Sequence, residues 1–204
     1  MSGPGDEDAA GAAAAAPSPA AVAPTAAAHR LPPAGTTTAR LVLRELAADD
    51  ADAAFIVELL NDPDWLRYIG DRNVRTAEDA LAYLARGPIA MYERHGFGLW
   101  LVARRGDGAP LGMAGLIKRD SLPDVDIGFA FLPAYRRAGF AREAAEAVLA
   151  LAWSRYALRR VVAIVSPGNA PSRRLLERLG MHVEGEAPGS TEADPLVLYG
   201  CSAP

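Results

Sequence analysis

The chain has few of the residues that form disulfides, metal clusters or membrane spans. Its 204 residues include a single cysteine, Cys201, and three histidines. One cysteine cannot form an intramolecular disulfide, and so few candidate ligands cannot build a cysteine/histidine zinc cluster. No run approaches the roughly 20 apolar residues that a membrane-spanning helix needs. We therefore expect a cytoplasmic protein without a metal site and without membrane contact.

A basic excess and several familiar catalytic motifs are also missing. The chain has 21 Lys and Arg against 25 Asp and Glu, a net charge of −4, whereas nucleic-acid binding needs clustered positive charge. It has no Gly-x-Ser-x-Gly elbow, no Walker lysine motif and no His-Glu-x-x-His. Nucleic acid is therefore not an expected partner, and serine hydrolase, nucleotide hydrolase and zinc protease chemistry are disfavoured.

Residues 1–36 differ in composition from the rest of the chain. They are rich in alanine, proline, glycine and serine and contain almost no large apolar side chains, so they cannot bury enough surface to offset chain entropy. Early acidic residues and prolines within the alanine runs argue against a signal or transit peptide. We predict a disordered tail over 1–36, with tethering as its alternative role, followed by one folded domain over 37–204.

The pattern of apolar residues over 37–204 predicts an α/β (α+β) fold with a mixed sheet. Helices are expected at about 50–60, 76–84, from Gly139 onwards and at 170–179, so that two helices precede the main run of strands. A strand, helix, strand order between 125 and 165 implies a parallel right-handed crossover. The other strands are expected to pair antiparallel. The strands of the whole sheet, the parallel pair included, are expected at 41–44, 99–104, 111–117, 125–132, 161–165, 181–185 and 196–200.

The stretch from Arg136 to Ala141 links a strand to a long amphipathic helix. A helix N-terminus exposes unpaired backbone N–H groups and the positive end of the helix dipole. Small residues such as Gly139 and Ala141 let a pyrophosphate approach the main chain, while Arg136 and Arg137 would add cationic donors. The stretch is therefore a candidate phosphate site, with a solvated turn as the alternative.

The order of elements and the residues at both ends of the crossover resemble the GNAT superfamily of N-acetyltransferases. Its acetyl-CoA motif, Arg/Gln-x-x-Gly-x-Gly/Ala, is met by Arg136, Gly139 and Ala141. Its central strand and its second conserved block are matched by Ile127–Pro133, Asn169–Ser172 and Leu175–Met181.

Leu41–Arg44 and Tyr68–Asp71 further resemble the branch typified by the ribosomal-protein-alanine acetyltransferases. The resemblance covers about residues 37–202 and implies an N-acetyltransferase domain over 37–204. It also implies a mostly antiparallel mixed sheet, flanked by helices, whose central parallel strands splay apart. Backbone groups left free in this wedge would pair with the pantetheine arm of acetyl-CoA.

The resemblance also implies which residues hold acetyl-CoA. Main-chain groups would line the thioester, and an N–H near Leu132 would polarise its carbonyl as an oxyanion donor. Asn169 would reach the pantetheine amide, although a helix N-cap is an alternative role for it. The implied binding residues are Phe131, Leu132, Pro133, Arg136, Arg137, Ala138, Gly139, Phe140, Ala141, Asn169 and Ser172.

Acetyl transfer to an amine requires a group that accepts a proton, because the amine attacks only when it is neutral. Asp126 is the first candidate, since the family often has a carboxylate at this place on the central strand; the alternative is a polar residue on a solvated strand face. Asp124 is better explained by its proline turn. The remaining candidates are Glu184, Glu192 and Asp194.

The leaving thiolate needs only a weak acid. Many members of the family use a tyrosine where this chain has Leu176, so Ser172, one turn earlier, is the substitute, unless it is simply a first-turn serine that satisfies the backbone. The other candidates are Tyr135, Tyr156 and Tyr199.

Together these features predict an acetyl-CoA-dependent N-acetyltransferase that works by direct attack in a ternary complex. The acceptor would be a protein N-terminus or a small-molecule amine, and the enzyme a monomer or homodimer. The alternative is a non-catalytic module that binds or senses acyl-CoA.

Overall fold

The computed structural model describes residues 35–204. The tail predicted for 1–36 therefore lies outside the described residues, apart from its last two positions. Thr36 already pairs with Leu43 across the first strands of the sheet, so ordered structure begins slightly before the predicted boundary. Within the described part of the chain, no helix is long and apolar enough to cross a membrane.

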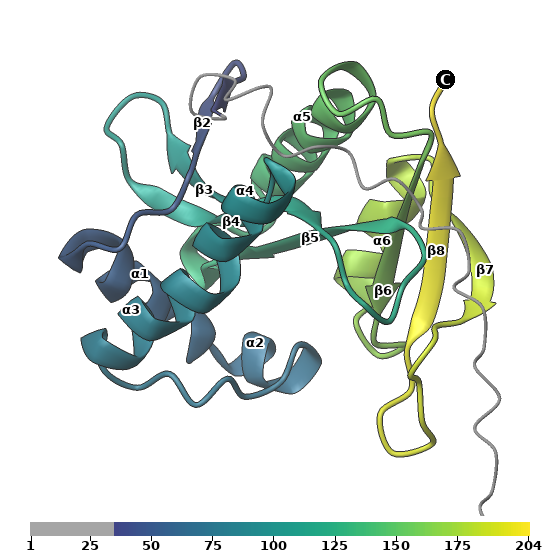
Figure 1. Cartoon of the computed structure of the whole chain (residues 1–204), viewed down its shortest axis with the longest axis horizontal. Coiled ribbons are helices and arrows are strands. Elements are labelled where there is room, and N and C mark those ends of the chain that lie inside the picture. The colour runs from purple at the N-terminus through teal and green to yellow at the C-terminus, as the bar shows by residue number, and fades with distance from the viewer. Residues whose placement is uncertain (1–34) are drawn as a thin grey trace, which may run out of the picture.

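One eight-stranded sheet forms the centre of the domain (Figure 1). Its spatial order is β1-β2-β3-β4-β5-β6-β8-β7. Every neighbouring pair is antiparallel except β5 and β6, which confirms the predicted mixed sheet. The strands are β1 (Thr36–Thr37), β2 (Leu41–Arg44), β3 (Leu99–Arg104), β4 (Pro110–Ile117), β5 (Val125–Phe131), β6 (Arg160–Val165), β7 (His182–Glu186) and β8 (Val197–Ser202).

The parallel pair β5 and β6 separates soon after it begins. The two strands pair only where Val125 and Asp126 lie beside Val161 and Val162, although β5 continues to Phe131 and β6 to Val165. In Figure 1, β5 crosses the molecule while β8, the other neighbour of β6, stands nearly upright. A wedge therefore opens toward the carboxyl ends of β5 and β6, as the splayed pair predicts.

Local capping signals define most of the helices. Asp49 caps α1 (Asp50–Leu60) and Thr76 forms a capping box with Asp79 at α3 (Ala77–Leu84). The helix that follows β5 is α5 (Phe140–Ser154), and the one that follows β6 is α6 (Ala170–Arg178). Gly180, with φ of 80°, ends α6 in the left-handed conformation expected of a residue beyond the helix C-cap.

The prediction that two helices precede the main strands is wrong, because α2 (Pro63–Tyr68) and α4 (Ala90–His95) also form there. Pro63 ends α1 but also occupies the first turn of α2, where a missing N–H costs nothing, and Asp62 caps that turn. Pro88 cannot donate the N–H that continues an α-helical ladder. The chain passes this point as a π-helical stretch (η1, Ala85–Ile89) and continues into α4.

Two apolar cores lie on opposite faces of the sheet, since side chains alternate along each strand. On one face, α5 packs its alanine-rich stripe against Trp100, Val102 and Ala114. On the other, α1 and α3 pack against residues of β3 and β4 that include Leu101 and Met113. The second face therefore lies beneath α1 to α4, and the wedge between β5 and β6 opens beside it.

Candidate active site

A cleft of about 840 Å³ occupies the wedge. Its sheet side is lined by residues of β4, β5 and β6, including Met113, Gly128, Ala130, Ala163 and Val165. Its helical side is lined by α2, α3, η1 and α4, through residues that include Trp65, Tyr68, Tyr83, Pro88 and Met91. A Cβ built on Gly168, in the turn after β6, would lie 3.9 Å from the Tyr68 ring, so α2 reaches that turn across the cleft.

Strand β5 directs a row of backbone amides into the wedge. The N–H of Leu132 donates to the carbonyl of Leu111 at 2.9 Å, toward β4. In an antiparallel ladder successive residues point their N–H groups to opposite sides. The N–H groups of Phe129 and Phe131 therefore face β6 beyond the last paired residues of the two strands. The amide of Leu132 itself is engaged by β4, so the open N–H groups near it on β5 are those of Phe129 and Phe131.

The turn before α5 is shaped to expose its main chain. Arg137 and Gly139 have φ of 63° and 82°, a conformation that turns successive amides toward one side of the loop. The first backbone bond of the helix runs from the N–H of Glu143 to the carbonyl of Gly139 at 3.1 Å. The preceding N–H groups of α5 thus lie before its hydrogen-bond ladder and are available to an anion.

Arg40, in the turn before β2, holds this loop from outside. Its Nη1 donates to the carbonyl of Ala138 at 3.0 Å, its Nε donates to Glu143 at 2.6 Å, and its guanidinium lies 4.5 Å from the centre of the Phe140 ring. No local motif marks Arg40 for this role, because its partners lie about a hundred positions away along the chain.

Arg136, predicted as a cationic donor for the pyrophosphate, is bound by protein groups. Its Nε donates to the carbonyl of Phe131 at 2.8 Å and its Nη1 to Asp64 at 2.6 Å, while its Nη2 donates to the buried Asp62. Arg136 therefore ties the loop to the N-terminus of α2. The exposed Arg137 side chain makes no hydrogen bond within residues 35–204 and remains open to a ligand.

Asp126 lies where the wedge begins and contributes to the cleft lining. It is 1% exposed, rather than on a solvated strand face. Its Oδ2 accepts a hydrogen bond from the Nε of Arg119 at 2.6 Å, and its Oδ1 has no hydrogen-bond partner in the described chain. Burial raises the pKa of the Asp126 carboxyl above its usual value, although Arg119 opposes the shift. Raising the pKa of a carboxylate strengthens it as a proton acceptor.

The start of α6 forms another part of the lining. Asn169 caps the helix by accepting the N–H of Ser172 at 3.2 Å, which confirms the N-cap role considered for it, and both residues line the cleft. Ser172 is half-buried and its hydroxyl makes no hydrogen bond within residues 35–204. Leu176 also lines the cleft, is 2% exposed and has no proton to give.

Most of the remaining catalytic candidates lie elsewhere or are already bonded. Glu184 pairs with Arg160, which lowers the pKa of that carboxyl. The buried hydroxyl of Tyr199 accepts a hydrogen bond from the Nε of Arg173 at 3.0 Å. Of the side chains predicted as further acids or bases, the described cleft includes Asp194 but not Asp124, Glu184, Glu192, Tyr135, Tyr156 or Tyr199.

Three arginines and Tyr83 belong to the cleft but were not singled out from the sequence. Arg67 lies in the last turn of α2, Arg72 in the loop before α3, and Arg119 after β4. They come from separate helices and loops, so no motif joins them. Burial raises the pKa of the Tyr83 hydroxyl, although the positive charges of Arg72 and Arg119 oppose the shift.

Comparison with known protein families matches residues 40–182 to the family described as an acetyltransferase (GNAT) domain. The uncharacterized N-acetyltransferase YnaD of Bacillus subtilis is 32% identical over 149 residues, which cover 73% of this chain and 83% of the relative.

Solved structures show the same architecture. An acetyltransferase of the GNAT family from Bacillus anthracis superposes with a TM-score of 0.69 at 25% identity, covering 83% of this chain and 98% of that one. The ribosomal-protein-S5-alanine acetyltransferase of Vibrio fischeri has a TM-score of 0.67 at 17% identity, covering 83% and 96% of the two chains. At that lower identity the likeness concerns the fold.

Proposed function

Because the chain belongs to the GNAT family of acetyltransferases, we propose that it transfers the acetyl group of acetyl-CoA directly to a primary amine in a ternary complex. Acetyl-CoA is the acetyl donor of this family. The observation that carries the proposal is the wedge between β5 and β6, which joins open strand amides to an exposed helix N-terminus.

The pyrophosphate of acetyl-CoA would bind the main chain from Arg137 to Ala141, where Gly139 and Ala138 leave room for close approach. Arg137 would add its free guanidinium, while Arg136 would hold the loop rather than contact phosphate. The pantetheine arm would follow β5 from Pro133 and Leu132 inward, and Asn169, through the amide nitrogen not used in capping, would reach it from α6.

The chemistry requires a proton to leave the amine and a negative charge to be stabilised on the thioester oxygen. Asp126 would accept the proton, directly or through water, while the nitrogen lone pair forms the new bond to the acetyl carbon. The N–H groups of Phe129 and Phe131 would stabilise the oxyanion. The carbon–sulfur bond then breaks, and the thiolate would take a proton from Ser172 or from solvent.

A thiol-release assay over a panel of amines and N-terminal peptides tests this proposal. Acetyl-CoA binding should be measured in parallel by calorimetry. We expect release of CoA that depends on the amine, with stoichiometric formation of the N-acetyl product in mass spectrometry. Binding of acetyl-CoA without turnover on any acceptor would contradict it.

That outcome would favour the second candidate, a non-catalytic module that binds or senses acyl-CoA. Leu176 supports this alternative, because a buried leucine stands where many members of the family have an acidic tyrosine. Ser172, one turn away on the same lining, is the group that would keep the site catalytic.

A further inference from the structure

We infer that the acceptor amine carries a carboxylate, and that Arg72, Tyr83 and Arg119 bind this carboxylate at the helical side of the cleft. This inference rests on the proposed function and specifies its acceptor. It follows from the charge of the lining, from the open donors on it, and from the contacts that hold the Arg72 loop in place.

The cleft is locally basic although the chain is acidic. The charged side chains of its lining are three arginines, Arg67, Arg72 and Arg119, and two aspartates, Asp126 and Asp194. Three positive and two negative charges leave the lining at +1, whereas the whole chain carries −4. A site for a polyamine or another purely cationic amine would be expected to show the opposite sign.

The donors at this end are open to a ligand. Arg119 spends its Nε on Asp126, and its Nη1 and Nη2 make no hydrogen bond within residues 35–204. Arg72 and the Tyr83 hydroxyl likewise make none in that range. The three side chains line the same cleft. Guanidinium forks and a phenol are well matched to the two oxygens of a carboxylate.

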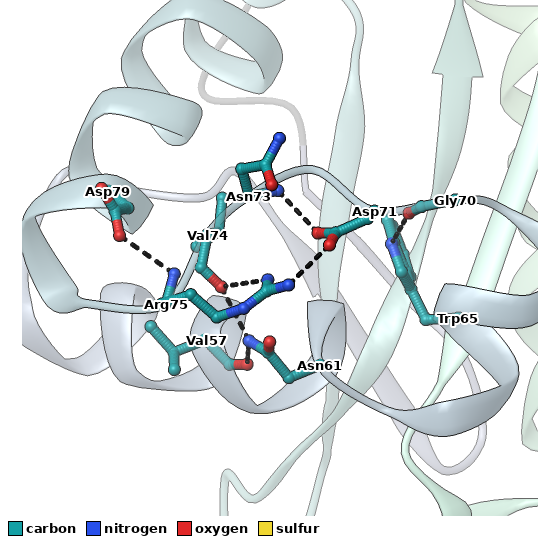
Figure 2. A network of polar contacts seen from close by, with 9 residues as sticks. All are labelled: Val57, Asn61, Trp65, Gly70, Asp71, Asn73, Val74, Arg75 and Asp79. Atoms are coloured by element: carbon teal, nitrogen blue, oxygen red, sulfur yellow. Dashed lines mark hydrogen bonds and ion pairs between the residues drawn. The ribbon is translucent and has the colours of Figure 1, made fainter.

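The loop that carries Arg72 is braced by the polar network of Figure 2. Trp65 Nε1 donates to the carbonyl of Gly70 at 3.1 Å, which fixes the start of the loop on α2. Arg75 Nη2 donates to Asp71 at 2.6 Å across the loop. Asp71 also accepts the N–H of Asn73 at 2.7 Å.

The far side of the same loop is fastened to α1. Asn61 Nδ2 donates both to the carbonyl of Val57 at 2.7 Å and to that of Val74 at 2.8 Å. The residues on both sides of Arg72 are therefore held, and its own side chain is presented from a fixed backbone. Such bracing lowers the entropy lost when a ligand orders the site.

Asp126, which is bonded to Arg119, adds a negatively charged group next to the arginines of the cleft. Asp126 lies beside Arg119 and keeps one oxygen without a hydrogen bond in the described chain. An amine that approaches Asp126 would place a nearby carboxylate within reach of Arg119, Arg72 and Tyr83. The apolar wall of Pro88 and Met91 would contact the carbons between the two groups.

The test compares carboxylate-bearing amines with their uncharged amides. The probes are L-amino acids, ω-amino acids and the amide of each, together with amidated tetrapeptides that have Asp or Asn at the second position. For each pair kcat/KM is measured on the full chain, on Arg72→Gln, on Tyr83→Phe and on Arg94→Gln. Arg94 is an exposed arginine on α4 outside the cleft lining and without a hydrogen bond in the described chain, which makes it a matched control.

We expect the unaltered protein to favour the carboxylate member of at least one pair. Arg72→Gln should lower that preference about tenfold or more, the value of a hydrogen bond to a charged group, mainly through KM. Tyr83→Phe should lower it less, and Arg94→Gln should leave it unchanged. The ratio of kcat/KM for the acid to that for its amide is compared between variants, so the difference in amine pKa within a pair cancels. Preference among free amino acids would identify a small-molecule acceptor, and preference for the Asp tetrapeptide an acidic protein N-terminus.

Equal or faster turnover of the amides by the unaltered protein, with each kcat/KM divided by the neutral fraction of its amine, would overturn this inference and leave the proposed function standing. An equal effect of Arg72→Gln on acids and amides would also overturn it, because the arginine would then act on the site as a whole. Absence of turnover on every amine would instead overturn the proposed function, and this inference with it.

Discussion

Replacing Asp126 by asparagine should separate catalysis from stability. The substitution keeps the size of the side chain and removes a carboxylate that is 1% exposed and bonded to Arg119. If Asp126 is the general base, the variant can use only the fraction of amine that is already neutral. For an α-amine with a pKa of roughly 8 that fraction is about one tenth at pH 7. Loss of the base itself is worth roughly 10²- to 10⁴-fold.

The loss should depend on pH. We expect kcat/KM of Asp126→Asn to fall by at least about 100-fold at pH 7 and to recover about tenfold of that loss as the pH passes the pKa of the acceptor, because the neutral fraction of the amine rises from about one tenth to one. The assay is thiol release from pH 6 to pH 10 with saturating acetyl-CoA. Asp194→Asn is the matched control, because Asp194 also lines the cleft but is exposed.

The thermal stability of Asp126→Asn should not fall along with its activity. Burial raises the pKa of Asp126 in the folded state, so between its unfolded and folded pKa values the folded protein binds more protons, and stability falls as the pH rises through that window. At neutral pH the ionised carboxylate therefore costs stability. Asparagine removes this cost and leaves Arg119, which is 35% exposed, to water. The Tm of Asp126→Asn at pH 7 should equal or exceed that of the unaltered protein.

A parallel shift of the whole pH profile, with the same loss at pH 7 and pH 10, would refute the role of Asp126 as base. A large fall in Tm together with loss of activity would show instead that Asp126 acts through the fold. In either case the Asp194→Asn profile, measured in the same series, tests the other carboxylate of the cleft as the base.

Three further substitutions test other parts of the site. Gly139→Glu should weaken acetyl-CoA binding by about 100-fold in calorimetry. A side chain there would contact Arg40, would be strained at a φ of 82°, and would place negative charge at the helix N-terminus. The control Gly108→Glu, at a φ of 72° with open space around it, should leave binding unchanged. Ser172→Ala should lower kcat by about tenfold without raising KM for acetyl-CoA, and an unchanged kcat would mean that the thiolate leaves unassisted. Arg136→Gln should reduce the free energy of unfolding by roughly 2 kcal/mol in urea, since it leaves Asp62 buried without its partner; unchanged stability would contradict its role as a tie between the loop and α2.

Local sequence accounts for much of the fold. Asp49, Thr76 and Gly180 set helix ends through their own backbone neighbours, so each was recognisable within a few residues. The apolar run of β6 and the alanine stripe of α5 predicted a crossover packed on a sheet, which the structure confirms. The same local signals failed at Pro63 and Pro88, because proline both ends one helix and fits the first turn or a widened turn of another.

The sequence by itself determined the family, the crossover and the glycine-containing turn, because these depend on contacts between near neighbours and on motifs a few residues long. The tertiary structure decided what surrounds each candidate. It bonded Arg136 to Asp62, 74 positions away, buried Asp126 beside Arg119, and brought Arg72 and Tyr83 into the lining of one cleft. Charge, burial and hydrogen bonding are set by which distant segments pack together, and no short stretch of this chain carries that information.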